Sequence, residues 1–367
     1  MQENQIKVNK KIIFLGTPDF AVPILEKLIN SDYKPVAVFC APDKPVGRKQ
    51  NLTPLPTKIL AQKHNIPVFQ PANSHELADT LKTTPHDLIV TTAYGLILPK
   101  EILLAPKYGC LNIHPSLLPK YRGPSPIQAA ILNGDAATGV TIYKMDEQID
   151  HGPIIAQERI SLSSVVASEA KQSRNTAAVH SPSRSLGRSA GEIATSPTTP
   201  RNDKLTTPEL SDKLSELGAN LLLKILPDWL TAQITPQPQD DSQATFTKII
   251  TKEDGQIDWQ KSALAIERQI RAYTPWPGSH ATLLDYSLSE AKGRVEGSKI
   301  KIIQADAVER NYGQQIGKIF LTETSDLIVQ TGDGALIVKK LQMEGGKPLD
   351  VSDFLRGHSD IIRQVLK

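Results

Sequence analysis

Residues Lys11–Ile29 have the sequence KIIFLGTPDFAVPILEKLI, in which a short apolar run ends at a glycine and a longer amphipathic stretch follows. The run KIIFLG predicts a buried β-strand, because it is short and almost entirely apolar. The stretch after it predicts an α-helix, with Thr17 placed to cap the helix and Pro18 in its first turn. A strand followed closely by a helix indicates the first half of a parallel β-α-β unit.

The same alternation continues through the first half of the chain. Apolar runs such as PVAVFC and HDLIVTTAYG alternate with helical stretches such as SHELADTLK, where Ser74 is the expected cap, and PIQAAILNG, which ends at a glycine stop signal. This pattern predicts an α/β fold with an open, doubly wound, mostly parallel sheet. GVTIYKMD and GPIIAQERIS then predict a pair of strands. Ligands of such sheets bind at the carboxyl ends of the strands.

The last third of the chain has a different pattern. Short strands at regular spacing, such as KIKIIQA and ALIVKKLQ, predict a small OB-like β-barrel. The stretch TAQITPQPQDDSQ is rich in Pro, Gln and Asp, which is typical of a linker. We therefore expect a catalytic α/β domain over residues 1–230, a linker over 231–247 and an OB-like domain over 248–367.

Composition narrows the class of protein. The 367 residues carry a net charge of +3, so any site for a polyanion must come from local clustering of basic residues. The sequence contains no apolar run of 18 residues and no pattern of a signal peptide, so we expect neither a membrane span nor a secreted protein. The two cysteines, Cys40 and Cys110, both lie in apolar runs, which favours buried thiols and a cytoplasmic location.

Residues Val165–Asn202 differ in composition from the rest of the chain. They contain no aromatic residue and no sustained apolar period, and they are rich in Ser, Thr, Ala, Pro and Arg. Such a segment cannot bury enough apolar surface to offset the entropy lost on ordering. The composition therefore predicts a disordered insertion between a strand and the helix PELSDKLSELGANLLLKIL.

A deletion tests this interpretation. Joining Ser164 to Asp203 should preserve both the melting temperature and the turnover number of the protein, because the removed segment is expected to pack against nothing. Thermal unfolding and a steady-state assay of the shortened chain measure the two quantities. A large loss of either would show that the segment packs or binds.

The stretch CLNIHPSLLPKYRGPSPIQ contains the candidate site. Residues two apart on a strand face the same side, so Asn112 and His114 project together at the end of the run CLNI, which Pro115 terminates. The amide offers N–H donors, and the imidazole exchanges a proton near neutral pH. This pair suits a reaction in which an oxygen gains negative charge and an amine loses a proton.

A carboxylate that orients the histidine is expected nearby. Asp150, in MDEQIDHGP, is the candidate, and Asp146 is its rival. A carboxylate beside the ring would stabilise the imidazolium. An isolated Asn-x-His more often satisfies backbone groups at a strand end, and Asp150 could be an ordinary turn residue.

The extended motif is more specific than the isolated one. NIHPSLLPKYRG followed by MDEQIDHGP resembles the 10-formyltetrahydrofolate-dependent formyltransferase family. The resemblance implies that Asn112, His114 and Asp150 are catalytic. It also implies that the formyl donor, 10-formyltetrahydrofolate, binds at two stretches of the chain. These stretches are Ser116, Leu117, Leu118 and Pro119 in the motif SLLP, and Ala93, Tyr94, Gly95 and Leu96 in AYGLILP.

Three further stretches resemble the members of this family that formylate methionyl-tRNA. They are GTPDFAVPILEKL, PDKPVGRKQNLTPLPTK and IDWQKSALAIERQIRAYTPWPGS. The second is a basic loop shaped by Gly and Pro, and the resemblance implies that Lys44, Arg48 and Lys49 bind the tRNA. Initiator methionyl-tRNA and folate are therefore the expected partners. The alternatives are a formyltransferase acting on an amino sugar or another small amine, and an RNA-binding module without chemistry.

The expected mechanism is direct attack of the amine on the formyl carbon. Asn112 would donate to the formyl oxygen, His114 would assist with that charge or move the proton, and Asp150 would orient the ring. The sequence offers no activated Ser or Cys at the motif and no cluster with metal-ligand spacing, so we expect neither a covalent enzyme intermediate nor a metal. G-x-G-x-x-G is absent after the first strand, which argues against a dinucleotide site. We expect the chain to act as a monomer.

Overall fold

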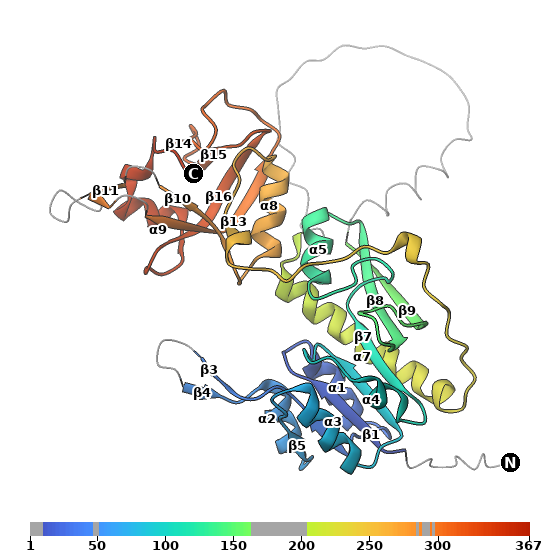
Figure 1. The fold of residues 1–367 in the computed structure, drawn as a ribbon. Helices are drawn as coiled ribbons and strands as arrows, with labels where there is room; N and C mark the ends of the chain where they lie inside the picture. Colours follow the sequence, from blue (N-terminus) through green and yellow to red (C-terminus); the bar gives the residue numbers. More distant parts are fainter. Residues whose placement is uncertain (1–9, 47–50, 163–203, 284–285, 288–293, 296–297) are drawn as a thin grey trace, which may run out of the picture.

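The computed structural model describes residues 10–46, 51–162, 204–283, 286–287, 294–295 and 298–367, and the expected insertion Val165–Asn202 lies outside them. An α/β domain comes first and a β domain second (Figure 1). Most buried apolar residues of the β domain form a cluster of their own, whereas Ala272 and Tyr273, at the end of α8 (Ala263–Ala272), pack into a cluster of the α/β domain. Within the described residues, no helix is both long and apolar enough to cross a membrane.

The α/β domain is built on a sheet that has seven strands among the described residues, in the order β5–β2–β1–β6–β7–β8–β9. The first five strands in this order are parallel, β8 is antiparallel to β7, and β9 is antiparallel to β8. The direction of winding reverses between β1 and β6, which places a ligand-binding switch point at their carboxyl ends. The strands are β1 (Ile12–Gly16), β2 (Ala37–Phe39), β5 (Val68–Phe69), β6 (Leu88–Thr92), β7 (Cys110–His114), β8 (Ala137–Lys144) and β9 (Ile154–Ser161).

Helices cover both faces of this sheet, as the alternation of apolar residues requires. On β1, Ile12 and Phe14 pack into one core cluster, whereas Ile13 and Leu15 pack into the other. The first cluster includes residues of α1 (Ala21–Ile29), α2 (Pro56–Lys63), α5 (Pro126–Asn133) and α7 (Thr207–Leu230). The second includes residues of α3 (Ser74–Thr83) and α4 (Lys100–Leu104). The doubly wound prediction is therefore confirmed.

The two predicted helix caps are wrong, whereas the glycine stop is right. Helix α1 begins only at Ala21, and the Thr17 hydroxyl instead accepts a hydrogen bond of 3.1 Å from the Ala41 amide. Asn73, and not Ser74, caps α3 by accepting from two backbone amides. Both residue types are strong caps, so local geometry determines which one serves. Helix α5 does end at Gly134, which has the expected left-handed conformation.

The β domain contains the predicted barrel. An antiparallel sheet has the order β10–β13–β16–β15–β14, with β17 also paired to β16, and α8 (Ala263–Ala272) contributes to its core. Helix α9 (Val351–Gly357) follows β17 directly. The strands are β10 (Ser279–Thr282), β13 (Lys299–Val308), β14 (Ile319–Leu321), β15 (Leu327–Gln330), β16 (Ala335–Met343) and β17 (Leu349–Asp350).

Residues 363–367 close this barrel. Thr282, at the end of β10, exchanges backbone hydrogen bonds of 2.7 and 2.9 Å with Lys367. On the other side, the Leu366 amide donates to Gly317 at 2.9 Å and the Ile319 amide donates to Gln364 at 2.9 Å. The two edge strands, β10 and β14, are thus both bonded to the same short segment, which forms the seam of the barrel.

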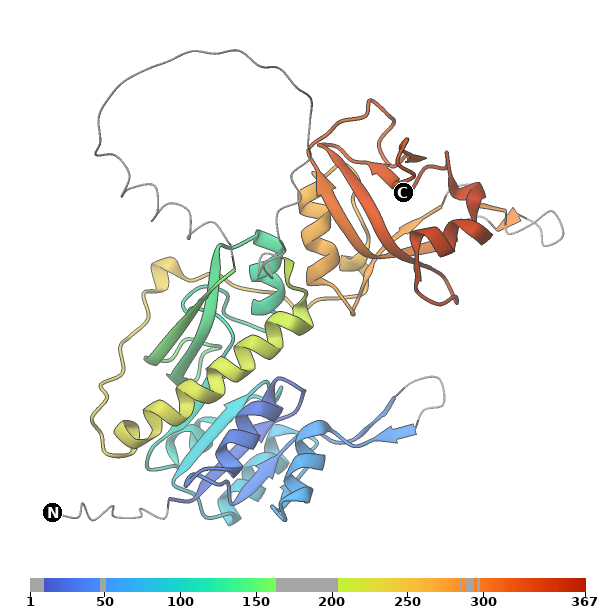
Figure 2. The same ribbon diagram turned by 180° about the vertical axis from the view of Figure 1, so that it is seen from behind.

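The segment between the domains is bound to the α/β domain along much of its length. After α7 it runs past β8 and β9 before it reaches the barrel (Figures 1 and 2). Gln237 forms a backbone bridge with Ile154, and Phe246 forms one with Arg122. We call residues 237–248 the strap. This segment therefore contacts the loops next to the sheet, although its composition is typical of a free linker.

The basic loop after β2 forms a small hairpin. Strands β3 (Lys44–Val46) and β4 (Asn51–Thr53) pair antiparallel, and the hairpin extends away from the sheet (Figures 1 and 2). At its base, Lys58 donates to Asp43 at 2.5 Å and to Gln70 at 2.8 Å. Gln70 also donates to Asp43 at 2.9 Å. These bonds tie the base of the hairpin to the residues after β5.

Candidate active site

Asn112, Tyr143 and Asp150 form one chain of hydrogen bonds at the carboxyl end of β7. The register between β7 and β8 places Tyr143 opposite Asn112, whose amide Nδ2 donates to the Tyr143 hydroxyl at 3.0 Å. That hydroxyl donates to Asp150 Oδ1 at 2.7 Å. Burial, and then the charge of Asp150, raise the pKa of Tyr143 well above its ordinary value, so the hydroxyl stays protonated. Tyr143 could not be identified from the sequence, because its position opposite Asn112 depends on the register of the two strands.

His114 lies between a backbone carbonyl and the Asp150 carboxylate. Its side chain is buried, with Nε2 at 2.9 Å from the Tyr121 carbonyl oxygen and Nδ1 at 3.5 Å from Asp150 Oδ2. A carbonyl oxygen can only accept, so Nε2 carries the hydrogen of the neutral ring. Nδ1 is then the nitrogen with a free lone pair, and it faces the Asp150 carboxylate.

The Asp150 carboxylate is held on both of its oxygens. Oδ1 accepts from Tyr143, and Oδ2 accepts from the Gly123 backbone amide at 2.7 Å. Asp150 itself has a φ of 49°, in the left-handed region that few residues other than glycine adopt. Its conformation is therefore fixed by its surroundings, which direct one oxygen toward His114.

Asp146 lies in a different contact. Its Oδ2 is 2.5 Å from His151 Nδ1, and this hydrogen bond raises the pKa of His151 above its ordinary value. His151 Nε2 also lies 3.4 Å from Asp241, a residue of the strap. The structure thus brings Asn112, His114 and Asp150 together and places Asp146 beside another histidine.

The SLLP loop is fixed to the neighbouring strands. Ser116 is buried, and its hydroxyl donates to the Lys120 carbonyl at 2.6 Å. The Leu118 amide donates to Thr141 on β8 at 3.0 Å, and the Leu118 carbonyl accepts from Gln157 on β9 at 2.8 Å. Leu117 and Pro119 are half-buried. The loop therefore has a set shape beside the catalytic candidates.

The loop Ala93–Leu96 follows β6 and lies at the same edge of the sheet. Thr92, the last residue of β6, ties the two strands together by donating to the Ile113 carbonyl at 2.9 Å. Ala93 and Gly95 are exposed and have positive φ values of 45° and 91°. Tyr94 is buried in the core cluster of α3 and α4, and its hydroxyl has no hydrogen-bond partner among the residues that the structure describes. Exposed backbone between buried apolar residues suits a flat ligand with polar edges.

One of the residues predicted to bind tRNA lies in the described part of the β3–β4 hairpin. Lys44 is exposed on β3, whereas Arg48 and Lys49 lie outside the described residues. Lys58, the last residue of the basic stretch PDKPVGRKQNLTPLPTK, forms an ion pair with Asp43. Hydrogen bonds from Lys58 and Gln70 lower the pKa of the Asp43 carboxyl. Lys58 thus anchors the base of the hairpin.

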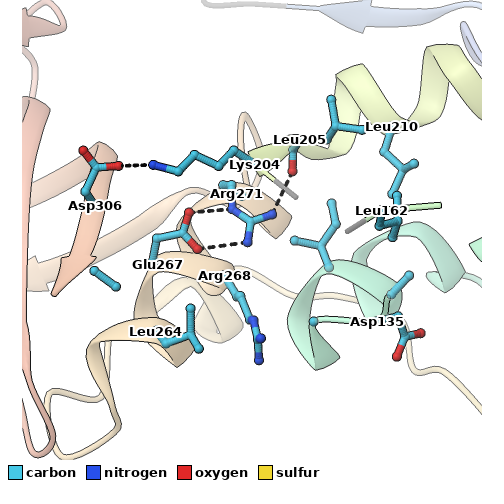
Figure 3. Close-up of a pocket in the computed structure, with 14 residues that line it drawn as sticks. Asp135, Leu162, Lys204, Leu205, Leu210, Leu264, Glu267, Arg268, Arg271 and Asp306 are labelled. Carbon is cyan, nitrogen blue, oxygen red and sulfur yellow. Dashed lines mark hydrogen bonds and ion pairs between the residues drawn. The ribbon is translucent and has the colours of Figure 1, made fainter. Parts of the chain in front are cut away.

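A pocket of about 280 Å³ lies between the two domains and is separate from this site. Figure 3 shows Arg271 between Glu267, which it contacts at 2.6 and 2.9 Å, and the Leu205 carbonyl, which it contacts at 3.0 Å. Lys204 pairs with Asp306 at 2.6 Å across the same pocket. None of the three catalytic candidates lines it. In the described part of the chain, no group of three or more His, Cys, Asp or Glu residues is arranged to hold a metal.

Comparison with protein families gives two matches. The family model described as formyl transferase matches residues 10–185, and the one described as formyl transferase, C-terminal domain, matches residues 249–359. The methionyl-tRNA formyltransferase of Halalkalibacterium halodurans is 40% identical over 350 residues, which cover 95% of this chain and 94% of the relative. That of Chloroflexus aurantiacus (strain J-10-fl) is 38% identical over 357 residues, covering 96% and 99%.

Solved structures share the fold at much lower identity. The N-formyltransferase of Helicobacter canadensis, in complex with folinic acid and dTDP-3-aminofucose, is 19% identical with a TM-score of 0.56, covering 90% of this chain and 98% of that one. HypX of Aquifex aeolicus, in complex with tetrahydrofolic acid, is 16% identical with a TM-score of 0.56, covering 95% of this chain and 47% of that one. At these identities the likeness concerns the fold alone.

Proposed function

The chain belongs to the formyl transferase family, and from this premise we propose that it transfers the formyl group of 10-formyltetrahydrofolate to the α-amino group of initiator methionyl-tRNA, in the initiation of translation. One observation carries the proposal: relatives named methionyl-tRNA formyltransferase match about 95% of the chain at 36–40% identity, so both domains are included. The arrangement of the site also supports the proposal, since Asn112 is linked to Asp150 by hydrogen bonds through Tyr143 and His114 Nδ1 lies 3.5 Å from Asp150.

The donor site we propose lies at the edge of the sheet formed by β6 and β7. Ser116, Leu117, Leu118 and Pro119 would bind the donor from one side, and Ala93, Tyr94, Gly95 and Leu96 from the other. The exposed backbone of Ala93 and Gly95 and the fixed SLLP loop support this assignment. The bound donor supplies an electrophilic formyl carbon.

The catalytic residues have separate tasks in this proposal. An α-amine titrates near pH 8, and it must be neutral to attack. Asn112 donates one N–H to the Tyr143 hydroxyl, and its other N–H can donate to the oxygen that gains negative charge. His114 accepts the proton at Nδ1, because Nε2 is committed to the Tyr121 carbonyl. Asp150 stabilises the resulting imidazolium and holds its orientation. As the new bond to the amine nitrogen forms, the bond between the formyl carbon and N10 of the donor breaks, and His114 returns its proton to that departing nitrogen.

A competition between acceptors tests the proposal. The purified chain is given the formyl donor together with charged initiator tRNA, an amino sugar or glycinamide ribonucleotide. We expect formylation of the charged tRNA. Formylation of the small amines alone would contradict the proposal and favour the amino-sugar alternative, to which structural neighbours of low identity lend only weak support.

Replacing Arg48 tests the proposed tRNA contact. We expect Arg48→Ala to weaken the use of charged tRNA and to leave folate affinity nearly intact, because the resemblance to the family assigns Arg48 to the basic tRNA-binding loop and assigns the donor to other stretches of the chain. If Arg48 contacts a phosphate, the salt dependence of tRNA binding should also become shallower, by about one unit of slope. Titrations of the protein with tRNA at several salt concentrations measure this change. Lys82→Ala, on the exposed side of α3, is the matched control, and an equal loss of folate affinity in Arg48→Ala would contradict the assignment.

The remaining assignments complete the proposal. Residues 1–230 form the catalytic domain, residues 231–247 the connection and residues 248–367 the OB-like domain. Lys44 and Lys49 bind tRNA alongside Arg48. The enzyme acts as a monomer in the cytoplasm, and sedimentation of the purified chain measures its oligomeric state.

A further inference from the structure

We propose that Gln239, a residue of the strap, positions Asp150 for catalysis, an inference that rests on the proposed function. The side-chain amide of Gln239 donates to two carbonyl oxygens of the Asp150 turn, that of Asp150 at 2.9 Å and that of Gly152 at 2.8 Å. Its own oxygen accepts from Arg122 Nε at 3.1 Å and from Arg122 Nη2 at 2.8 Å. One half-buried side chain thus connects the two loops that meet at the catalytic histidine.

The Asp150 turn depends on this support. Asp150 has a left-handed backbone, which costs free energy and persists only where neighbouring groups impose it. Among the described residues, Gln239 alone donates to the carbonyls of Asp150 and Gly152. Without these bonds the turn loses the contacts that set the orientation of its backbone, and the carboxylate moves with the backbone.

Arg122 connects Gln239 to the opposite side of the site. Its side chain is only 3% exposed and donates to Asp241 of the strap at 2.7 Å as well as to Gln239. Its backbone amide donates to Thr245, and its carbonyl accepts from Thr247, both at 2.8 Å. The strap therefore holds the segment around Arg122 by main chain and side chain together.

This segment makes both contacts that define the geometry of His114. The Tyr121 carbonyl fixes Nε2 of the ring, and the Gly123 amide fixes Oδ2 of Asp150. Tyr121 is itself held by its amide, which donates to the Thr245 hydroxyl at 2.8 Å. Hydrogen bonds with the strap thus hold Tyr121 and Arg122, while Gln239 holds the Asp150 turn.

The distance between His114 and Asp150 explains why such support matters. Nδ1 and Oδ2 are 3.5 Å apart, beyond the usual length of a charge-assisted hydrogen bond. A displacement of about 1 Å in a reacting group can cost on the order of 10²-fold in rate. Gln239 does not touch the reacting atoms, so it is a positioning residue that acts through Asp150.

Three variants of the full chain test the proposal. Gln239→Ala removes all four contacts, and Gln239→Glu keeps an acceptor for Arg122 but removes the donors to the Asp150 turn. Gln237→Ala is the matched control, because within the described part of the chain the Gln237 side chain donates only to Thr235 of its own segment. We expect kcat to fall roughly 10- to 100-fold in both Gln239 variants, with KM for tRNA unchanged. Gln237→Ala should behave as the unaltered enzyme.

Two results would overturn the proposal. The first is a Gln239→Ala rate within about twofold of the Gln237→Ala rate. The second is a double variant, Gln239→Ala with Asp150→Asn, whose loss of rate equals the product of the two single losses. A residue that acts through Asp150 should lower the rate little further once the carboxylate is gone.

A spectroscopic measurement on the free protein separates this proposal from the choice of acceptor. The ¹⁵N resonances of the His114 ring, assigned by their loss in His114→Ala, report the environment of Nδ1. They should shift in Gln239→Ala in the same direction as in Asp150→Asn, and they should not shift in Gln237→Ala. This holds whichever amine the enzyme formylates. Unchanged resonances in Gln239→Ala would refute the positioning role even in a protein that fails to formylate methionyl-tRNA.

Discussion

Asn112→Ala should lower the single-turnover rate of formyl transfer by roughly 10²–10³-fold, the usual cost of removing one donor to a developing oxyanion. Binding of folate and of tRNA should change far less, because the charge on the oxygen develops only as the reaction proceeds. The substitution also removes the donor to Tyr143, but the Tyr143 hydroxyl can still donate to Asp150, so the carboxylate should keep its place.

Single-turnover measurements with saturating donor and tRNA give the rate for each variant. Asn220→Ala is a suitable control, since Asn220 is an exposed asparagine on α7 whose amide, in the described ranges, donates only to Glu216. If Asn112→Ala reduced affinity as much as rate, Asn112 would be a binding residue and not a stabiliser of the reacting oxygen.

Asp150→Asn should be comparably severe. Both carboxylate oxygens now accept hydrogen bonds, from Tyr143 and from the Gly123 amide. An asparagine can satisfy the Gly123 amide only by placing its oxygen there, which turns its NH₂ group toward the Tyr143 hydroxyl. The atom facing His114 is then a neutral amide oxygen, and the imidazolium loses its counter-charge. We expect a loss of roughly 10²–10³-fold in the single-turnover rate.

Two comparisons make this result specific. Asp146→Asn should be nearly normal, because Asp146 pairs with His151; a severe loss in Asp146→Asn with a normal Asp150→Asn would reverse the two assignments. The double variant His114→Ala with Asp150→Asn should be scarcely slower than the slower single variant, if the two residues act as one unit. Additive losses would instead show that His114 and Asp150 act separately.

The strand and helix patterns were sufficient to predict the doubly wound sheet and the barrel. Their periodicity reflects burial, which is encoded locally. The family was predicted from NIHPSLLPKYRG and MDEQIDHGP, and that prediction is confirmed by the two family matches. Asn112 and His114 could be paired from the sequence because residues two apart on a strand share a face. The catalytic and ligand-binding roles of the individual residues remain predictions.

Contacts between distant segments could not be predicted from the sequence. Tyr143 faces Asn112 only in the register that β7 and β8 adopt. The strap has the composition of a free linker, yet Gln239 and Thr245 bond to loops more than 80 residues away in the chain. Polar side chains that are hydrated in an isolated segment can equally form hydrogen bonds with unpaired backbone groups of neighbouring loops. The composition of the segment therefore predicts a hydrated linker and does not reveal these hydrogen bonds.

The seam of the barrel has a consequence for how the protein is made. Synthesis on the ribosome proceeds from the N-terminus, so β10 and β14 emerge long before residues 363–367. Until those residues leave the exit tunnel, both edge strands expose unpaired amides and carbonyls, the groups through which sheets of different molecules join. The α/β domain can assemble its sheet much earlier. Nascent chains on crowded polysomes should therefore be most prone to associate with one another through the unfinished second domain.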